Sequence, residues 1–524
     1  MHLYRAFATV GGLTLLSRVF GFLRDILVAA TLGSGAVADA FFVAFRFPNL
    51  FRRLFGEGAF NSAFIPLFAK RLEGEGREVA RRFAEEALAG LLMVLLILTV
   101  VAEIFMPLLM LGLAPGFNAT PEKFDLTVLL TRITMPYLLC MSLVALLSGV
   151  LNSVGKFVES SSVSIVLNLT MMAATFIAIA LGYTNEPAAG VIQAWGVFWA
   201  GVLQLLLLLD GARRNGLHLR LRRPRLTPGV RDLIRLGIPG VVAGGVTQIN
   251  IMIGTVIASM QDGAVSHLYY ADRVYELPLA IVGIAIGVVL LPDVARHLRA
   301  GNHDAVMDSQ NRSLEFALLL TLPASVALAV VPTEIVKGLF ERGAFTARDT
   351  PFTAYALAIF AFGLPSFVMI KVFSPAYFAR EDTKTPMRYA TISLTANTVG
   401  SIGLFLLFRH LGLMPHLGIA LATTLGGWLN AGLLYTTLVR RGAFVADARI
   451  KRALPRILLA SLIMGGALFA LAPYVAPWLS APTTTVLRFA ALGALVGSGL
   501  LVYALAALAL GAVDVGQFRR LLRR

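Results

Sequence analysis

Apolar runs long enough to cross a lipid bilayer follow one another along almost the whole chain of 524 residues. A helix needs about 20 mainly apolar residues to cross the hydrocarbon core. Charged residues make up 14% of the chain and hydrophobic residues 57%, whereas a soluble domain carries about a quarter charged residues. The sequence therefore predicts an all-α polytopic membrane protein and argues against a soluble enzyme or a disordered chain.

The apolar runs and the polar connections between them predict about fourteen transmembrane helices. Several runs exceed the length of a bare span, so their ends are expected to project into water. The expected helices lie near residues 5–31, 37–68, 83–112, 125–150, 160–182, 189–210, 230–260, 266–297, 312–338, 352–378, 387–408, 413–439, 453–475 and 486–511.

Arginine and lysine gather in alternate connections between these helices, while the intervening connections carry little excess positive charge. The basic set lies near residues 70–82, 156, 213–225, 296–312, 380–388 and 440–452, and in the tail at 519–524. The positive-inside rule makes this set cytoplasmic. Both termini then face the cytoplasm, which agrees with an even number of spans. The net charge of +16 is thus interpreted as a topology signal, and no nucleic-acid partner is expected.

The chain also matches itself at a nearly constant offset, a little under half of its length. GAVADAFFVAFRFP at 35–48 aligns with GAVSHLYYADRVYELP at 263–278, and IPLFAKRL at 65–72 aligns with LPDVARHL at 291–298. A repeat of six helices enters the membrane twice in the same direction, as in transporters built from parallel repeats. We therefore expect two six-helix lobes related by a parallel pseudo-twofold repeat, followed by two further helices.

This repeat predicts three parts of the chain. Residues 1–215 form an N-lobe with helices 1–6, residues 216–445 form a C-lobe with helices 7–12, and residues 446–524 form two additional C-terminal helices. Folds of this kind bind their substrate between the lobes, near the middle of the membrane.

Charged side chains concentrate in the first, second and eighth expected helices, although a charge at the bilayer centre costs roughly 2.5–3.5 kcal/mol or more. They are Arg18, Arg24 and Asp25 in the first helix, Asp39, Arg46, Arg52, Arg53 and Glu57 with Asn49 in the second, and Asp272, Arg273 and Glu276 in the eighth. The arginines outnumber the carboxylates. Since a planar guanidinium binds phosphate oxygens in pairs, the pattern favours a water-filled cationic cavity for an anion. Buried ion pairs that only fix helix packing remain the alternative.

Helix geometry limits which of these side chains can meet. Arg18 and Asp25 are seven residues apart and share a helix face, as do Ser17 and Arg24. Arg18 and Arg24 lie about 120° apart on a straight helix. Both reach one cavity only if the helix bends, and Gly21 permits such a bend.

The segment SRVFGFLRDILVAATLGSGAVADAFFVAFRFPNLFRRLFGEGAFNSAFIPLF at 17–68 resembles the MviN/MurJ lipid II flippases, within the multidrug/oligosaccharidyl-lipid/polysaccharide exporter superfamily. YYADRVYELP at 269–278, LFERGAFTARDT at 339–350 and SPAYFAREDTKTP at 374–386 match the same pattern. The resemblance covers essentially the whole chain, including the two C-terminal helices.

The resemblance implies a transporter rather than an enzyme. Such a flippase moves the lipid-linked peptidoglycan precursor, lipid II, from the inner to the outer leaflet of the bacterial cytoplasmic membrane by alternating access, in cell-wall biogenesis. Carried over to this sequence, it implies substrate-binding roles for Arg18, Arg24, Arg52, Arg273 and Asp39, the arginines holding the diphosphate. It also implies gating or supporting roles for Ser17, Asp25, Asn49, Glu57, Asp272 and Glu276. The expected partners are lipid II and the bilayer, with the cell-wall synthesis machinery as a further candidate.

No cofactor or metal is expected, and the membrane potential is the expected driving force. Some members of the family hold a sodium ion with a carboxylate on the seventh helix. Here that helix offers Gln248 and Asn250 in mid-span, with Asp232 only at its edge. Sodium coupling is therefore not expected.

Three other functions are compatible with parts of this pattern. A polysaccharide-lipid flippase or drug exporter of the same superfamily shares the lobes, but an exporter of organic cations needs carboxylates in its cavity. A membrane enzyme acting on polyprenyl diphosphates needs acidic or histidine side chains poised for proton transfer, and no paired-carboxylate motif of that kind occurs in the sequence. A scaffold for cell-wall enzymes would tolerate replacement of the arginines in helices 1, 2 and 8.

Overall fold

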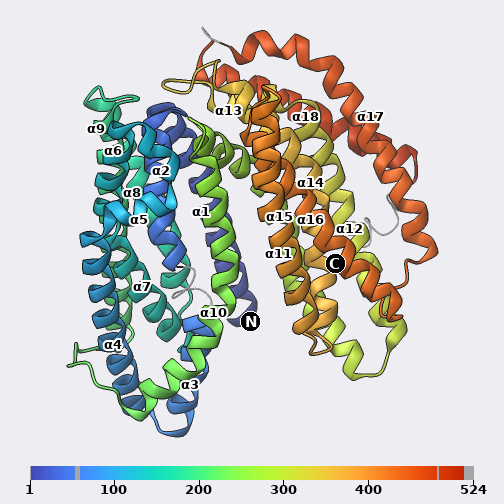
Figure 1. Cartoon of the computed structure of the whole chain (residues 1–524). Coiled ribbons are helices and arrows are strands. Elements are labelled where there is room, and N and C mark those ends of the chain that lie inside the picture. The colour runs from blue at the N-terminus through green and yellow to red at the C-terminus, as the bar shows by residue number, and fades with distance from the viewer. Residues whose placement is uncertain (1, 53–58, 481–482, 513–524) are drawn as a thin grey trace. The chain divides into compact units, whose positions relative to one another are not determined.

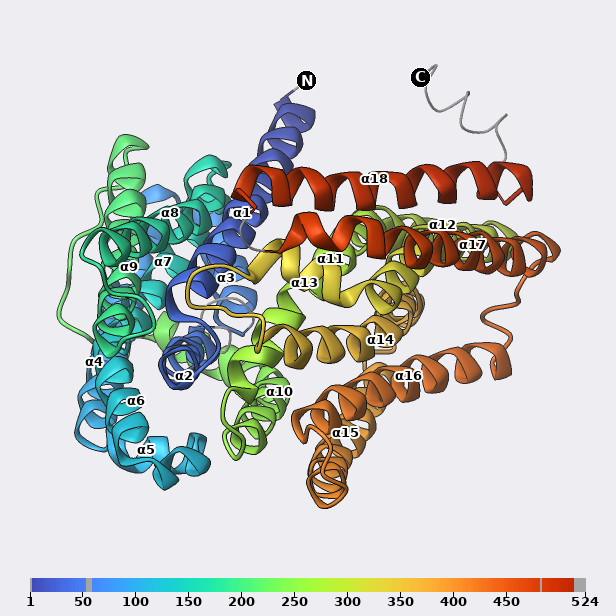
Figure 2. The ribbon, with the colours of Figure 1, turned by 90° about the horizontal axis from the view of Figure 1, so that it is seen from above.

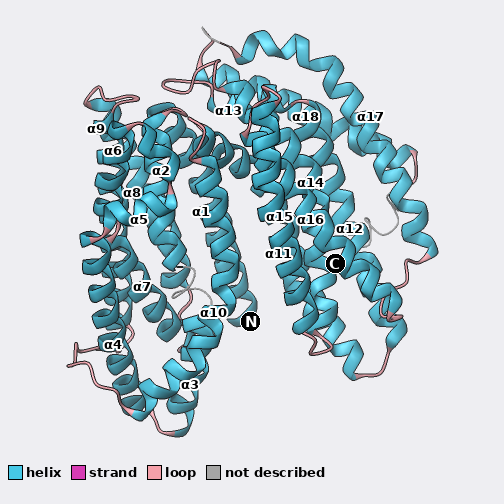
Figure 3. Ribbon diagram, viewed as in Figure 1, coloured by secondary structure: helices cyan, strands magenta, loops and turns pink. Residues whose placement is uncertain are grey.

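The computed structural model describes residues 2–52, 59–480 and 483–512, and all regular elements in these ranges are helices (Figures 1 and 3). Ten helical segments within these ranges are long and apolar enough to cross a membrane. The prediction of an all-α polytopic membrane protein is thus confirmed, while the number of fourteen spans stays a prediction.

The helices follow one another with short connections. In chain order they are α1 (His2–Leu32), α2 (Ala36–Arg52), α3 (Ala59–Gly74), α4 (Arg77–Ile104), α5 (Met106–Leu113), the 3-10 helix η2 (Pro115–Ala119), α6 (Pro121–Thr134), α7 (Pro136–Ser153), α8 (Val158–Ala180), α9 (Pro187–Arg214), α10 (Pro228–Ala258), α11 (Ala264–Arg299), α12 (His303–Val330), α13 (Pro332–Phe340), α14 (Thr350–Phe378), α15 (Lys384–His410), α16 (His416–Arg440), α17 (Ala448–Leu479) and α18 (Thr485–Ala509).

Four of the expected helices are each divided into two elements. The expected helix 37–68 corresponds to α2 and α3, with residues 53–58 outside the described ranges. The other three divide where a proline enters the first turn of the second element, at Pro107 in α5, Pro136 in α7 and Pro332 in α13. Proline lacks the N–H that an interior helical position donates, but it fits the first turn. Hydropathy does not detect these breaks because the apolar run continues through them.

The element boundaries confirm the internal repeat. The helices α4 and α12 begin at Arg77 and His303, and the short helices that follow them begin at Met106 and Pro332. The two members of each pair are separated by the same stretch of chain. The starts of α8 and α15, at Val158 and Lys384, have this separation as well. The same alternation of long and short helices is therefore built twice.

Two compact units make up the chain. Unit 1 contains residues 1–266 and 342–345, and unit 2 contains residues 267–341 and 346–524. Helix α10, which the repeat assigns to the second lobe, packs on α3, α4 and α5 within unit 1. In unit 2, α17 packs on α12 and α18 (Figure 2). The predicted lobe boundaries at 215 and 445 stay a prediction.

Aromatic side chains hold the helices of unit 1 together near the start of α4. The ring of Phe64 stacks on those of Phe68 and Phe83, with centroid distances of 5.6 and 5.5 Å. All three side chains are buried. Because lipid tails are as apolar as leucine, close packing of this kind, rather than removal from water, joins helices in a membrane.

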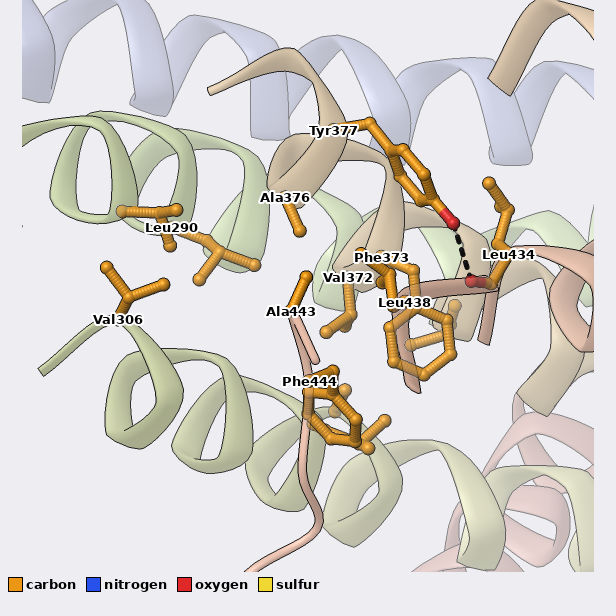
Figure 4. Close-up of a cluster of buried hydrophobic side chains, with 14 of the residues drawn as sticks. Leu290, Val306, Val372, Phe373, Ala376, Tyr377, Leu434, Leu438, Ala443 and Phe444 are labelled. Carbon is orange, nitrogen blue, oxygen red and sulfur yellow. Dashed lines mark hydrogen bonds between the residues drawn. The ribbon is translucent and has the colours of Figure 1, made fainter. Parts of the chain in front are cut away.

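A second cluster joins α14 to α16 in unit 2 (Figure 4). Phe373 and Tyr377 of α14 lie among Leu434, Leu438 and Phe444. The Tyr377 hydroxyl donates a hydrogen bond of 2.7 Å to the Leu434 carbonyl, so its one polar atom is satisfied within the apolar cluster.

Candidate functional site

Arg24 is buried in α1 and is held from three sides. Its Nη2 donates to Oδ1 of Asp25 at 2.7 Å, and its Nε donates to the same oxygen at 3.1 Å. Its Nη1 donates to Oδ1 of Asn168 in α8 at 3.0 Å. The Asn168 amide in turn donates to the Ser17 carbonyl at 2.8 Å. The structure thus brings together three predicted site residues, Ser17, Arg24 and Asp25, and adds Asn168, which the sequence analysis did not assign to the site.

Gly21 lies against Asn168 where α1 packs on α8. A Cβ atom at Gly21 would lie 3.4 Å from Nδ2 of Asn168, in ordinary van der Waals contact with the amide that positions Arg24. This contact is separate from the helix bend that the sequence analysis expects at Gly21. Arg18, on the same helix, has an exposed side chain and forms no ion pair with another residue in the described ranges.

Arg273 of α11 is also compensated by a carboxylate. Its Nη1 lies 2.7 Å from Oε2 of Glu276, one helical turn away. The guanidinium stacks over the ring of Tyr269 at 4.8 Å from the centroid, a favourable cation–π geometry. Asp272 is half-buried beside it. Arg24 and Arg273 therefore each have a carboxylate partner on their own helix.

Asp39 lies at a different place from Arg24, in the first turn of α2. Its Oδ2 accepts from Nζ of Lys123 at 2.8 Å and from the Gly263 amide at 2.8 Å. Its Oδ1 accepts from the amide of Ser266 at 2.9 Å and from the Ser266 hydroxyl at 2.8 Å. The carboxylate therefore caps the start of α11, where amides without helical partners and the helix dipole both favour negative charge. Lys123 also reaches Asp262 at 3.0 Å.

Lys123 is a functional candidate that the sequence pattern does not reveal. It lies near the start of α6, in a stretch with no excess positive charge, and its partner Asp39 precedes it by 84 positions. The ammonium also lies 4.1 Å from the centroid of the Phe117 ring. Only the folded chain places this cation beside the buried carboxylate.

The end of α1 also contacts the connection at 342–345. The Ala344 amide donates to the Ala30 carbonyl at 2.8 Å. A Cβ atom at Gly343 would lie 2.2 Å from the same carbonyl oxygen, and one at Gly33 would lie 2.7 Å from the Ala344 carbonyl oxygen. Both glycines have positive φ, +57° and +67°. Unit 1 contains three connections that are expected outside the cytoplasm. They lie near 33–35, 262–266 and 342–345.

The remaining predicted site residues are placed as follows. The Asn49 side chain donates to the Phe45 carbonyl within α2 at 3.0 Å. Arg52 is the last residue of α2, and Glu57 lies outside the described ranges. Gln248 of α10 is buried, and no group of three or more His, Cys, Asp or Glu side chains suited to a metal occurs in the part of the chain that is described.

The helical architecture resembles that of a solved membrane protein. An inward-facing multidrug resistance MATE family transporter of the MOP superfamily shares the fold with a TM-score of 0.65, at 15% identity, over 83% of this chain and 97% of that chain. The two chains thus share an all-helical, multi-pass fold.

The family follows from closer matches. A family model described as lipid II flippase MurJ matches residues 28–486. The chain is 48% identical to the probable lipid II flippase MurJ of Rhizobium tropici, over 100% of this chain and 97% of that one. It is 34% identical to the lipid II flippase MurJ of Burkholderia cenocepacia, over 89% of both. A solved structure of lipid II flippase MurJ in an inward closed conformation matches with a TM-score of 0.76 at 26% identity, over 98% of this chain and 99% of that chain. The chain belongs to the lipid II flippase MurJ family.

Proposed function

We propose that this protein flips lipid II from the inner to the outer leaflet of the bacterial cytoplasmic membrane. The observation that carries the proposal is the family match across residues 28–486, together with 48% identity over the full chain to a probable lipid II flippase. The protein acts as a transporter that moves its substrate unchanged, and its role belongs to peptidoglycan synthesis.

The α1 arginines bind the diphosphate of the substrate. Arg24 is fixed by Asp25 and Asn168 before any substrate arrives, so little side-chain entropy is lost when an anion binds. Arg18 offers an exposed guanidinium on the same helix. A diphosphate accepts hydrogen bonds from more than one guanidinium. Its negative charge then neutralises part of the Arg24 charge that Asp25 neutralises before the substrate binds.

Arg273 and Arg52 also bind the diphosphate. The Glu276 carboxylate keeps Arg273 compensated while no substrate is bound. Binding of the diphosphate then favours approach of the lobes, because the anion neutralises arginines that would otherwise repel one another. The polyprenyl tail remains in the bilayer throughout.

Asp39 acts as a gate residue in this mechanism rather than as a ligand of the diphosphate. All of its described hydrogen bonds go to Lys123 and to the start of α11. Opening toward the outside requires that these bonds break, and re-forming them resets the protein.

The orientation follows the positive-inside rule, with both termini in the cytoplasm. An elementary charge that crosses the membrane potential changes its energy by about 2.3 kcal/mol per 100 mV. An inside-negative potential therefore favours outward movement of the anionic head group, and this driving force does not require ATP.

Depletion of the protein in its native cell, combined with an assay of which leaflet lipid II occupies, tests this proposal. We expect lipid II to accumulate in the inner leaflet on depletion, and Arg24→Ala to behave like depletion although the variant reaches the membrane. Arg77→Ala, which removes an exposed arginine at the start of α4, is the matched control and should flip normally. Normal access of lipid II to the outer leaflet in depleted cells would refute the proposed function. Normal flipping by Arg24→Ala alone would refute the arginine site.

A further inference from the structure

A groove with a volume of about 580 Å³ lies between α4 and α10 in unit 1. We call it the α4–α10 groove. Small residues line part of it, including Ala87 and Gly90 of α4 and Gly237 of α10. A Cβ atom at Gly90 or at Gly237 would meet no atom within 4 Å. Both helices therefore leave open space where other helix pairs in a membrane make contact.

The other walls of the groove are apolar and exposed. Met93 and Val94 of α4 are 44% and 51% exposed, and Ile234 and Ile238 of α10 are 44% and 56% exposed. The helix α4 is one of the segments suited to crossing a membrane. A slot of this composition matches a flexible hydrocarbon chain and offers almost nothing to a polar solute.

One end of the groove is built by a connection that α4 holds in place. The connection joins α9 to α10. The fully buried carboxylate of Glu85 accepts from the Arg220 amide at 3.0 Å and from Nε of Arg222. Glu86 accepts from the Thr227 hydroxyl at 2.8 Å. These bonds fix the connection on α4 before any ligand is present.

The same connection and the first turns of α10 carry positive charge that no carboxylate compensates in the described part of the chain. Arg225 lines it, and Arg223, Arg231 and Arg235 lie close in sequence with exposed side chains. None of these four guanidinium groups pairs with a carboxylate in the described part of the chain. The buried carboxylate of Glu85, in α4, already forms an ion pair with Arg222. An apolar slot with a cationic mouth is complementary to an anionic amphiphile.

We propose that the α4–α10 groove binds an anionic phospholipid of the cytoplasmic leaflet, with one acyl chain between the helices and its phosphate on Arg225. Basic pockets between transmembrane helices on the cytoplasmic side bind anionic lipid head groups. A bound chain fills the open space beside Gly90 and Gly237 and so joins α10 to α4. The inference rests on the proposed orientation of the basic connections, and it does not depend on the flippase activity.

Native mass spectrometry of the purified full chain tests this site, with phosphatidylglycerol and phosphatidylcholine of identical acyl chains as the probes. We expect a retained phosphatidylglycerol adduct and a much weaker phosphatidylcholine adduct. Removing one arginine near an anionic surface weakens binding about five-fold, so Arg225→Gln and Arg223→Gln should each lower phosphatidylglycerol retention by that amount. Gly90→Phe fills the slot and should lower it roughly ten-fold or more, because several methylene groups lose their place.

Two matched variants control for side effects. Gly403→Phe adds the same ring at an exposed glycine of α15 that also has open space, and Arg452→Gln removes an exposed arginine of α17. Both should retain phosphatidylglycerol as the unmodified chain does. Equal retention of both phospholipids, or unchanged retention by Gly90→Phe with an unaltered thermal midpoint, would overturn the proposal. So would displacement of phosphatidylglycerol by undecaprenyl diphosphate at equal concentration, since the groove would then bind the tail of the substrate.

Discussion

Nζ of Lys123 lies 2.8 Å from Oδ2 of Asp39, and the two side chains are 2% and 0% exposed. The same ammonium lies 3.0 Å from a carboxylate oxygen of Asp262, whose side chain is 91% exposed. One cation thus serves a fully buried carboxylate and a solvated one. The buried carboxylate of Asp39 depends on Lys123 for charge compensation. The exposed carboxylate of Asp262 does not, because water can solvate it.

We expect Lys123→Met to destabilise unit 1 strongly. Removing one member of a buried ion pair leaves the other charge uncompensated and costs about 3–5 kcal/mol. The variant should show a lower thermal midpoint in detergent and reduced lipid II flipping. Asp262→Asn should change the midpoint little, because an exposed ion pair contributes about 0–1 kcal/mol.

The double variant Lys123→Met with Asp39→Asn separates charge from shape. It removes both charges, so we expect it to regain much of the midpoint that Lys123→Met loses. A midpoint of Lys123→Met equal to that of the unmodified protein would contradict the role of this pair.

Asn168→Ala should reduce flipping about ten-fold or more, since a hydrogen bond to a charged group contributes about 1.5–3 kcal/mol. The substitution removes the acceptor that orients Nη1 of Arg24 and the donor that ties α8 to Ser17. The matched control is Asn397→Ala, a half-buried asparagine of α15 in unit 2. A leaflet-access assay on both variants checks the prediction, and equal loss in both would show that the effect does not pass through Arg24.

Gly343→Ala should destabilise the protein more than Gly412→Ala. Both glycines have positive φ, +57° and +67°, so both substitutions carry the strain of about 1 kcal/mol that a side chain meets there. Only at Gly343 would the new Cβ lie 2.2 Å from a backbone oxygen, that of Ala30. Thermal midpoints of the two variants provide the comparison. Equal shifts would mean that the contact between 342–345 and α1 adds nothing to stability.

Asp382, between α14 and α15, gives the protein a stability contribution that depends on pH. Its hydrogen bonds with the Arg441 guanidinium, the Thr385 hydroxyl and the Thr385 amide lower the pKa of the carboxyl from 3.8 to about 2. A lowered pKa in the folded protein stabilises it above the ordinary pKa, and this contribution is lost as the pH falls toward 2.

The difference in thermal midpoint between the unmodified protein and Asp382→Asn should therefore be full at pH 6 and shrink as the pH falls from about 4 toward 2. Asp304→Asn, which alters an exposed carboxylate in the first turn of α12, serves as the reference. A difference that stays constant over this pH range would contradict the assignment.

Long apolar runs were sufficient to locate almost every helix, because a membrane span must be long, apolar and internally hydrogen-bonded. The repeat was also visible in the sequence, because matching motifs recur in the same order in both halves. The divisions at Pro107, Pro136 and Pro332 were not predicted, because hydropathy responds to side-chain polarity and not to a missing amide.

The sequence by itself determined that this chain is a helical membrane protein, which loops are basic, and that arginine is concentrated in helices 1, 2 and 8. These are properties of composition and order along one dimension. Only the tertiary structure decided the partners of each charge: Arg24 with Asp25 and Asn168, and Asp39 with Lys123 and the start of α11. The energy of a buried charge depends on the few atoms within hydrogen-bonding distance, and packing brings those atoms together from positions far apart in the chain.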